Sequence, residues 1–263
     1  MGKLHVLTAC VSNLNGGGFG YSAEAEDQYG ASNGTLARQS AGLDGLDGLR
    51  QLRVIERVDN EARVRTWQRR VSFHVQMTTR SSLFHAQLDF SAVNFLNHTR
   101  VSKKFWINVD DLSGDRILQL NCLPRLQPEF RELLPNVHNL NSRVLLAFDG
   151  LNNFIGAVTH VSHKLRYDFE IYDERGEVLY RIRGPSVVRK VVWWEVPFQI
   201  HSPLEPYRIG LISRKWSGLL KELLEEEEHF LISFPPSASV AAKSLLLAAT
   251  FLIAHVCFHA QVA

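Results

Sequence analysis

The pattern of apolar and polar residues from position 43 onward is that of β-strands joined by short turns. Phe105, Ile107 and Val109 occupy every second position of one stretch. A turn sequence with a glycine follows at 111–114, and an apolar run at 117–120 comes after it. Successive side chains of a strand point to opposite faces, so this alternation around a turn predicts a β-hairpin.

The same hairpin design recurs further along the chain. Apolar residues alternate over 167–171, a turn sequence with a glycine lies at 173–176, and the alternation returns over 178–182. A second echo relates the segments 155–159 and 209–213, which read IGAVT and IGLIS. Two related β-units within one domain predict a closed or nearly closed sheet.

One more strand and two helices are predicted after these units. The strand-like stretch is 187–200, and its Pro197 is expected at a sheet edge or a bulge, because proline cannot donate a ladder hydrogen bond. A helix with four leucines on one face is predicted over 217–228. The last helix is expected to begin near Ser237 or Ser239, each a suitable N-cap residue.

This last helix, at about 240–260, has no formally charged residue from position 244 to the end of the sequence. A helix that is apolar all round must be buried in protein or in lipid. Its length of about 30 Å matches one hydrocarbon core. Two alternatives are therefore open, a membrane span with the main domain in the cytosol and a core helix inside a β-barrel. The residues assigned to this membrane or core helix are Leu245, Leu246, Leu247, Phe251, Leu252 and Ile253.

Composition divides the chain into two regions. Residues 1–42 are rich in Gly, Ser, Ala and Asn and are predicted to form a disordered tail, because they bury too little apolar surface to offset their ordering entropy. Residues 43–263 are predicted to form one domain. The net charge of +2 gives no global field that would select a partner. The 3 cysteines are far apart and odd in number, which favours a reducing compartment over a disulfide framework or a zinc site.

Two segments carry a resemblance to a known family. Residues 209–218 read IGLISRKWSG, and 230–235 read FLISFP, directly before the hydrophobic helix. In this order they resemble the phospholipid scramblase family. The resemblance implies a mainly β fold with helices (α+β), a tubby-like closed β-barrel around the hydrophobic C-terminal helix. It also implies ATP-independent, bidirectional, calcium-stimulated transbilayer movement of phospholipids, at the cytosolic face of the plasma membrane.

The family's calcium-binding segment falls on residues 226–237, where this sequence departs most from the pattern. Carboxylates remain at the first and third positions, but the closing position is Ser237, whose neutral hydroxyl stands where a charged ligand is expected. Calcium is therefore expected to bind weakly. The positions that the resemblance assigns to the metal are Glu226, Glu228, Phe230, Ile232 and Ser237.

The resemblance further implies an import segment at Arg214, Lys215 and Trp216, and with it a nuclear pool of the protein. The family's cysteine cluster, typically palmitoylated, is reduced here to Cys122. Acylation of that residue or of Cys10 in the tail stays open. The family's proline-rich N-terminal arm is absent from this sequence.

The favoured hypothesis is a scramblase that performs no covalent chemistry, since the sequence has neither a GxSxG motif nor an arguable cysteine–histidine pair. Its expected partners are the phospholipid membrane and a second copy of the chain, but not nucleic acid. The alternative is a non-transporting tubby-like module that binds anionic lipid headgroups or nucleic acid through arginines. Those proposed for the contact are Arg63, Arg65, Arg69 and Arg70, within a wider set that adds Arg50, Arg53 and Arg57.

Overall fold

The structure is a computed structural model that describes residues 42–59, 70–90, 104–137, 142–162, 166–186, 195–205, 207–215 and 229–259. Residues 1–41 of the predicted tail and the whole predicted helix over 217–228 lie outside the described residues. The division of the chain into a tail and one domain therefore stays a prediction.

Strands dominate the described residues. Their bounds are β1 Gln51–Asp59, β2 Arg70–Gln76, β3 Ser82–Phe90, β4 Phe105–Asp111, β5 Arg116–Leu123, β6 Val144–Asp149, β7 Phe154–Ser162, β8 Arg166–Asp173, β9 Val178–Ser186, β10 Glu195–His201, β11 Arg208–Lys215 and β12 His229–Ser233. Two short 3₁₀ helices, η1 Leu43–Leu46 and η3 Pro128–Phe130, lie outside the sheet.

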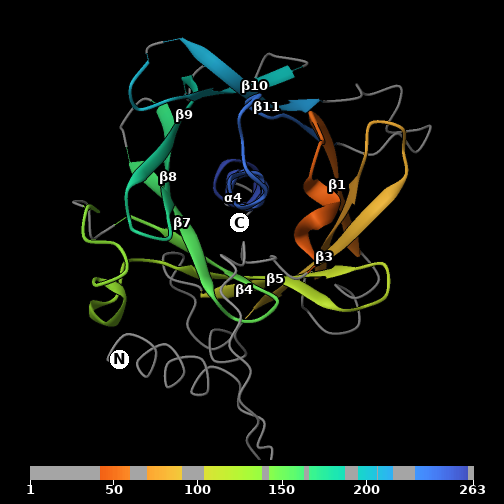
Figure 1. Cartoon of the computed structure of the whole chain (residues 1–263), viewed down its shortest axis with the longest axis horizontal. Coiled ribbons are helices and arrows are strands. Elements are labelled where there is room, and N and C mark those ends of the chain that lie inside the picture. Colours follow the sequence, from red (N-terminus) through yellow and green to blue (C-terminus); the bar gives the residue numbers. More distant parts are fainter. Residues whose placement is uncertain are drawn as a thin grey trace, which may run out of the picture. The chain divides into compact units, whose positions relative to one another are not determined.

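The twelve strands close into one antiparallel barrel (Figure 1). Each strand pairs with the next strand in the chain, and β12 pairs with β1 to complete the ring. Because the ring is closed, neither the first strand, β1, nor the last, β12, forms a free sheet edge. The predicted fold, a closed barrel around the C-terminal helix, is confirmed.

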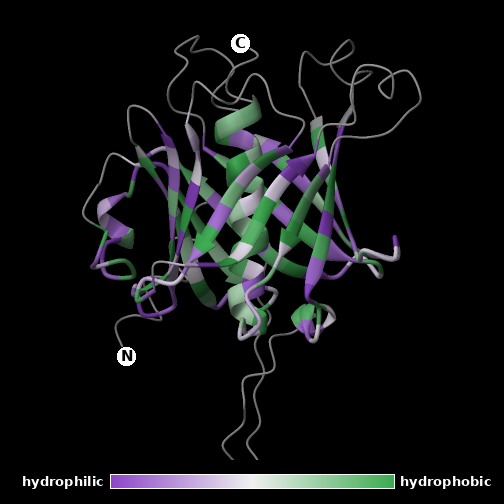
Figure 2. Ribbon diagram, turned by 90° about the horizontal axis from the view of Figure 1, so that it is seen from above, coloured by the Kyte–Doolittle hydropathy of each residue, from purple (hydrophilic) through white to green (hydrophobic). Residues whose placement is uncertain are grey.

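The predicted alternation sets the two faces of the wall. Phe105, Ile107 and Val109 of β4 point inward and are fully buried, whereas Trp106 and Asn108 between them are partly exposed. Figure 2 shows hydrophilic and hydrophobic residues alternating along the wall strands around the central helix. The barrel therefore has an apolar interior and a polar outer face.

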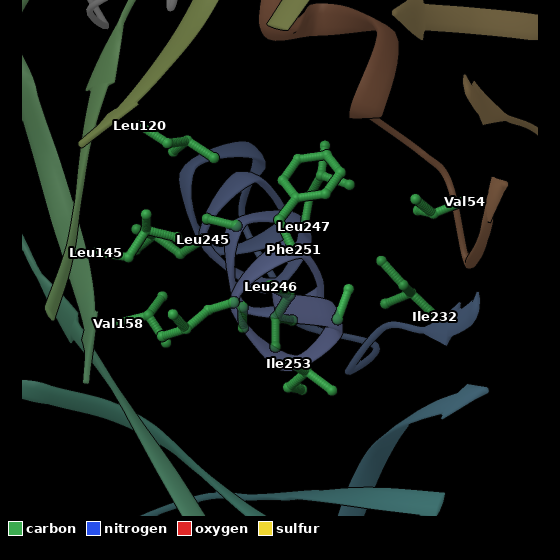
Figure 3. Close-up of a cluster of buried hydrophobic side chains, with 14 of the residues drawn as sticks. Val54, Leu120, Leu145, Val158, Ile232, Leu245, Leu246, Leu247, Phe251 and Ile253 are labelled. Atoms are coloured by element: carbon green, nitrogen blue, oxygen red, sulfur yellow. The ribbon is translucent and has the colours of Figure 1, made fainter. Parts of the chain in front are cut away.

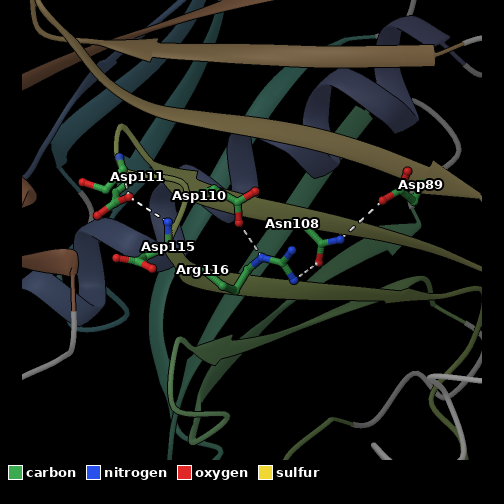
Figure 4. Close-up of polar contacts among 7 residues, drawn as sticks. Asp89, Asn108, Asp110, Asp111, Asp115 and Arg116 are labelled. Atoms are coloured by element: carbon green, nitrogen blue, oxygen red, sulfur yellow. Dashed lines mark hydrogen bonds and ion pairs between the residues drawn. The ribbon is translucent and has the colours of Figure 1, made fainter. Parts of the chain in front are cut away.

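The two predicted hairpins have the same type of turn between their strands. Between β4 and β5, one carboxylate oxygen of Asp111 accepts hydrogen bonds from the backbone N–H groups of Ser113 (2.8 Å) and Asp115 (2.9 Å) (Figure 4). Gly114 has a φ of 90°, a conformation that glycine adopts without steric cost. The repeated turn sequence thus encodes its own capping group.

A third copy of this turn joins β6 to β7. Asp149 accepts from the backbone N–H groups of Leu151 and Asn153, as Asp173 accepts from those of Arg175 and Glu177 between β8 and β9. At the position of the glycine stands Asn152, with a φ of 63°. Asparagine tolerates this left-handed conformation. The third turn therefore lacks the glycine that marks the other two in the sequence.

Helix α4 (Val240–Ile253) runs through the middle of the barrel and continues as a short π-helical segment, η5 (Ala254–His259) (Figure 1). The side chain of Ser239 accepts a hydrogen bond from the backbone N–H of Ala242 (3.2 Å). Ser239 is thus the N-cap, one of the two residues expected there.

The helix is buried on all sides. Every residue from Ala242 to Ile253 is buried, and the six apolar residues assigned to the helix are at most 1% exposed. Figure 3 shows Leu245 facing Leu145 and Val158, on the side of the helix opposite Val54 and Ile232. The structure therefore has the core-helix arrangement of the two alternatives. A membrane span by the same residues would require the helix to leave the barrel.

The start of the helix is tied to the segment that precedes β1. The ammonium group of Lys243 donates a hydrogen bond to the carbonyl oxygen of Leu46 (3.0 Å) and lies 5.8 Å from the centroid of the Phe234 ring. Lys243 itself is only 6% exposed. Buried charges are costly unless they are paired or hydrogen-bonded, and this bond helps to satisfy the lysine.

Ala249 tests the core position of the helix, because it is fully buried against the wall. Ala249→Lys places an unpaired charge in the apolar interior, so we expect a loss of at least about 4 kcal/mol of unfolding free energy, a large part of the about 5–15 kcal/mol that stabilises a typical domain. The matched control is Ala241→Lys, at an exposed position of the same helix. Denaturant unfolding followed by circular dichroism measures both. Equal stability of the two variants would contradict the placement of the helix.

Candidate functional site

The predicted calcium segment is described only in part. Phe230 and Ile232 belong to β12, their side chains point into the barrel, and they are 1% and 0% exposed. Because β12 pairs with both β1 and β11, its backbone serves the sheet ladder and does not form a metal-binding loop. Phe230 and Ile232 thus lie on a paired strand of the barrel, and their assignment to a calcium site stays a prediction.

Of the remaining calcium positions, the structure describes only Ser237. Ser237 is exposed in the turn before α4, and Glu226 and Glu228 lie outside the described residues. Within the described ranges, no group of three or more His, Cys, Asp or Glu side chains is arranged to hold a metal ion. Weak calcium binding through the two glutamates stays a prediction.

The described part of the predicted import segment lies in the wall of the barrel. Arg214 and Lys215 end β11, which pairs with β10 on one side and β12 on the other, and Trp216 lies outside the described residues. The guanidinium carbon of Arg214 lies 4.0 Å from the centroid of the Phe258 ring on η5. Arg214 therefore connects the wall to the end of the core helix.

The environment of Arg214 is unusual for a charged group. Burial lowers the pKa of the Arg214 guanidinium, and the nearby Glu56 carboxylate opposes this shift. A cation over an aromatic face contributes more when it is desolvated. We conclude that Arg214 has a packing role. A test of nuclear import therefore has to use Lys215→Ala rather than a change at Arg214.

The arginines proposed for lipid or nucleic-acid contact are mostly beyond the described part. Arg63, Arg65 and Arg69 lie outside it, and Arg70 begins β2 without a described side chain. Of the wider set, Arg50 and Arg57 are exposed, whereas Arg53 is half-buried with its Nη2 3.4 Å from Nδ1 of His229. No arginine-lined surface can be built from these residues, and this contact stays a prediction.

Cys122 is closed to acylation in the folded barrel. Its thiol points inward from β5 and is fully buried. Burial raises the pKa of the Cys122 thiol to about 12, so the group stays protonated at physiological pH. A thiol that is neither exposed nor ionised does not attack an acyl donor. Cys10, the other candidate, lies outside the described residues.

A row of polar contacts crosses the outer face of β3, β4 and β5 (Figure 4). Asn108 donates to Asp89 (3.3 Å) and accepts from Arg116 (2.9 Å), which also donates to Asp110. These groups are exposed or partly exposed, and exposed ion pairs stabilise a fold by at most about 1 kcal/mol. The row gives the outer face of the wall a hydrated, charged character.

Comparison with known proteins assigns most of the chain to one family model. The family model Scramblase matches residues 33–260. Phospholipid scramblase 2 of Bos taurus is 37% identical over 99 residues, which is 38% of this chain and 33% of the relative. Phospholipid scramblase 1 of Homo sapiens is 35% identical over 99 residues, 38% of this chain and 31% of the relative.

A more distant relative, phospholipid scramblase family member 5 of Homo sapiens, is 29% identical over 98 residues, 37% of this chain and 36% of the relative. The chain thus spans about a third of the length of the curated relatives it matches. No solved structure gives a significant match.

The packing of Arg214 on Phe258 leads to a stability prediction. Arg214→Ala removes the stacked cation and leaves space beside the ring, so we expect a loss of about 1–3 kcal/mol of unfolding free energy. The control is Arg208→Ala at an exposed position of the same strand, with an expected change within about 0.5 kcal/mol. Urea denaturation of the two variants provides the comparison. If the two variants unfold at the same urea concentration, Arg214 has no packing role.

Proposed function

The chain belongs to the scramblase family, and on that premise we propose that it moves phospholipids between the leaflets of a bilayer, in both directions, without ATP and with stimulation by calcium. The observation that carries the proposal is the family match over residues 33–260, which includes the whole of the described barrel and its core helix. The relatives that share part of this sequence are named phospholipid scramblases, which supports phospholipids as the substrate class.

The filled interior restricts where a lipid could pass. Helix α4 is buried on all sides within the wall, so the described barrel has no axial passage for a headgroup. A headgroup that crosses hydrocarbon without polar contacts loses several kcal/mol or more. We therefore place the path on the outer face, where polar groups such as Asp89, Asn108 and Arg116 can hold water beside the lipid.

Transport in both directions without ATP follows from such a path. A hydrated groove lowers the barrier between two leaflets without coupling to another reaction. The forward and reverse rates then rise by the same factor, because both pass through the same transition state. The proposed activity makes and breaks no covalent bond, and it leaves the equilibrium distribution of lipids between the leaflets unchanged.

The location proposed is the cytosolic face of the plasma membrane, with a nuclear pool in addition. The 19-residue span Val240–Phe258 has the length and composition to cross a membrane, but 78% of its most apolar window is buried inside the barrel. We propose that the folded barrel associates with the bilayer from one side. Self-association is part of the proposal, since two barrels side by side would enclose a longer polar path than one.

Reconstitution tests this function directly. The full chain is incorporated into liposomes with a leaflet-labelled phospholipid, and loss of the label from the inner leaflet is followed after a membrane-impermeant quencher is added. We expect faster exchange than in protein-free liposomes, in both directions and without ATP. Ala241→Lys should keep this activity and Ala249→Lys should lose it, as expected from their effects on folding. Liposomes that bind the protein while labelled lipid stays in its leaflet would favour the non-transporting module.

Calcium binding gives a separate prediction. We expect a dissociation constant of roughly 10⁻⁴–10⁻³ M, because affinity follows the number of charged oxygen ligands. Ser237→Asp adds a carboxylate at an exposed position and should tighten binding, whereas Glu226→Gln combined with Glu228→Gln should abolish it. Isothermal titration calorimetry with Ca²⁺ measures all three proteins. Micromolar affinity in the unmodified chain, or no response to either change, would show that the ion binds elsewhere.

A further inference from the structure

The barrel wall opens at one place among the described strands. Strands β9 and β10 pair at only three positions, the last of which joins Gln199 to Arg183. Beyond it β9 continues to pair with β8 as far as Ser186, and β10 pairs with β11 from Glu195 onward. The two strands therefore diverge while each keeps its other neighbour, and a gap remains between them.

Two prolines explain the divergence. If the register of Gln199 with Arg183 continued by two residues, Pro197 would lie opposite Pro185. Neither proline has a backbone N–H, so neither strand can donate a ladder hydrogen bond at this pair. Pro197, predicted at a sheet edge or a bulge, lies at this interrupted edge. The sequences of both strands thus favour the opening.

A pocket of about 510 Å³ occupies the opening, within the range of small-molecule sites. Pro185, Val196 and Pro197 form apolar parts of its lining. Gly184 also lines it and leaves no room for a side chain, since a Cβ there would lie 2.9 Å from the Phe198 ring. Only the backbone of Gly184 therefore separates the pocket from the buried ring of Phe198.

The charges at the pocket are of both signs. Arg166 is engaged by Asp168, 3.1 Å away. In contrast, Arg183 and Glu195 make no hydrogen bond or ion pair to the residues that the structure describes, and both are exposed. Lys215 lies opposite Glu195 across β10 and β11, and no ion pair joins the two. One cation and one carboxylate of the lining thus have no partner among the described residues.

We propose that this pocket binds the headgroup of a zwitterionic phospholipid, with the phosphate at Arg183 and the ammonium group at Glu195. Arginine presents a planar set of donors that suits phosphate oxygens. A carboxylate in the same pocket repels the second negative charge of a phosphate monoester and attracts an amine. The apolar lining at Pro185 and Pro197 suits the glycerol and first methylenes of the lipid. The physiological meaning of the site rests on the proposed function, but binding itself does not.

Calorimetry with a short-chain phosphatidylcholine below its micellar concentration tests the pocket in the full chain. Arg183→Gln should weaken binding about tenfold, the loss of one charge-assisted contact. Glu195→Gln should weaken binding of phosphatidylcholine and strengthen binding of short-chain phosphatidic acid. The matched control is Arg181→Gln, two residues earlier on the same strand, where the arginine pairs with Glu170 at 3.3 Å. Its affinity should stay within about twofold of the unmodified chain.

Several outcomes would overturn the proposal. They are equal effects of Arg183→Gln and Arg181→Gln, inorganic phosphate that binds as tightly as the lipid, and no binding at all. Circular dichroism melts identify any variant that is unfolded, and Arg183→Lys then replaces it, with partial retention expected. The liposome assay separates this claim from the proposed function. Binding without lipid exchange would count against the function alone, whereas exchange without binding to the pocket would remove the site alone.

Discussion

The constraint on which the rest of the structure depends is that a closed barrel of twelve strands must have its interior filled. Side chains alone fill a barrel of about eight strands, and the diameter grows with strand number. Here α4 supplies the missing volume, and burial of its apolar side chains at about 2 kcal/mol each is a major part of the stabilisation. Wall and helix are therefore one folding unit, because neither can bury its apolar surface without the other.

The close fit of helix and wall appears at particular residues. Gly156 of β7 has no space for a side chain, since a Cβ there would lie 2.8 Å from Leu245 of the helix. At the start of the helix Lys243 bonds to Leu46, and beyond its end the Phe258 ring packs under Arg214. These contacts fix the helix along its whole length. They also show that Arg214, within the segment that resembles an import signal, contributes to packing in this fold.

The wall could be predicted from the sequence, because alternation in β4 and β8 and the aspartate turns are local signals that need no knowledge of distant residues. The turn at Asn152 was missed since asparagine replaces the expected glycine. The environment of the C-terminal helix could not be decided, because an apolar helix suits a bilayer and a barrel interior equally. The strand at Phe230 could not be predicted from local sequence, because it depends on pairing with β1 and β11. The divergence of β9 from β10 could not be predicted from the sequence, because it depends on the register that would set Pro197 opposite Pro185.

A filled interior moves any lipid chemistry to the outer surface. On a closed antiparallel wall every backbone group is used by a neighbouring strand, and outward side chains contact water. Such a surface offers a lipid only shallow contacts, except where the ladder is interrupted. The prolines at 185 and 197 create such an interruption, next to the aromatic residues around Phe198 and beside charges of both signs. An amphiphile needs both apolar and charged contacts, and this gap brings Pro185 and Pro197 into one pocket with Arg183 and Glu195.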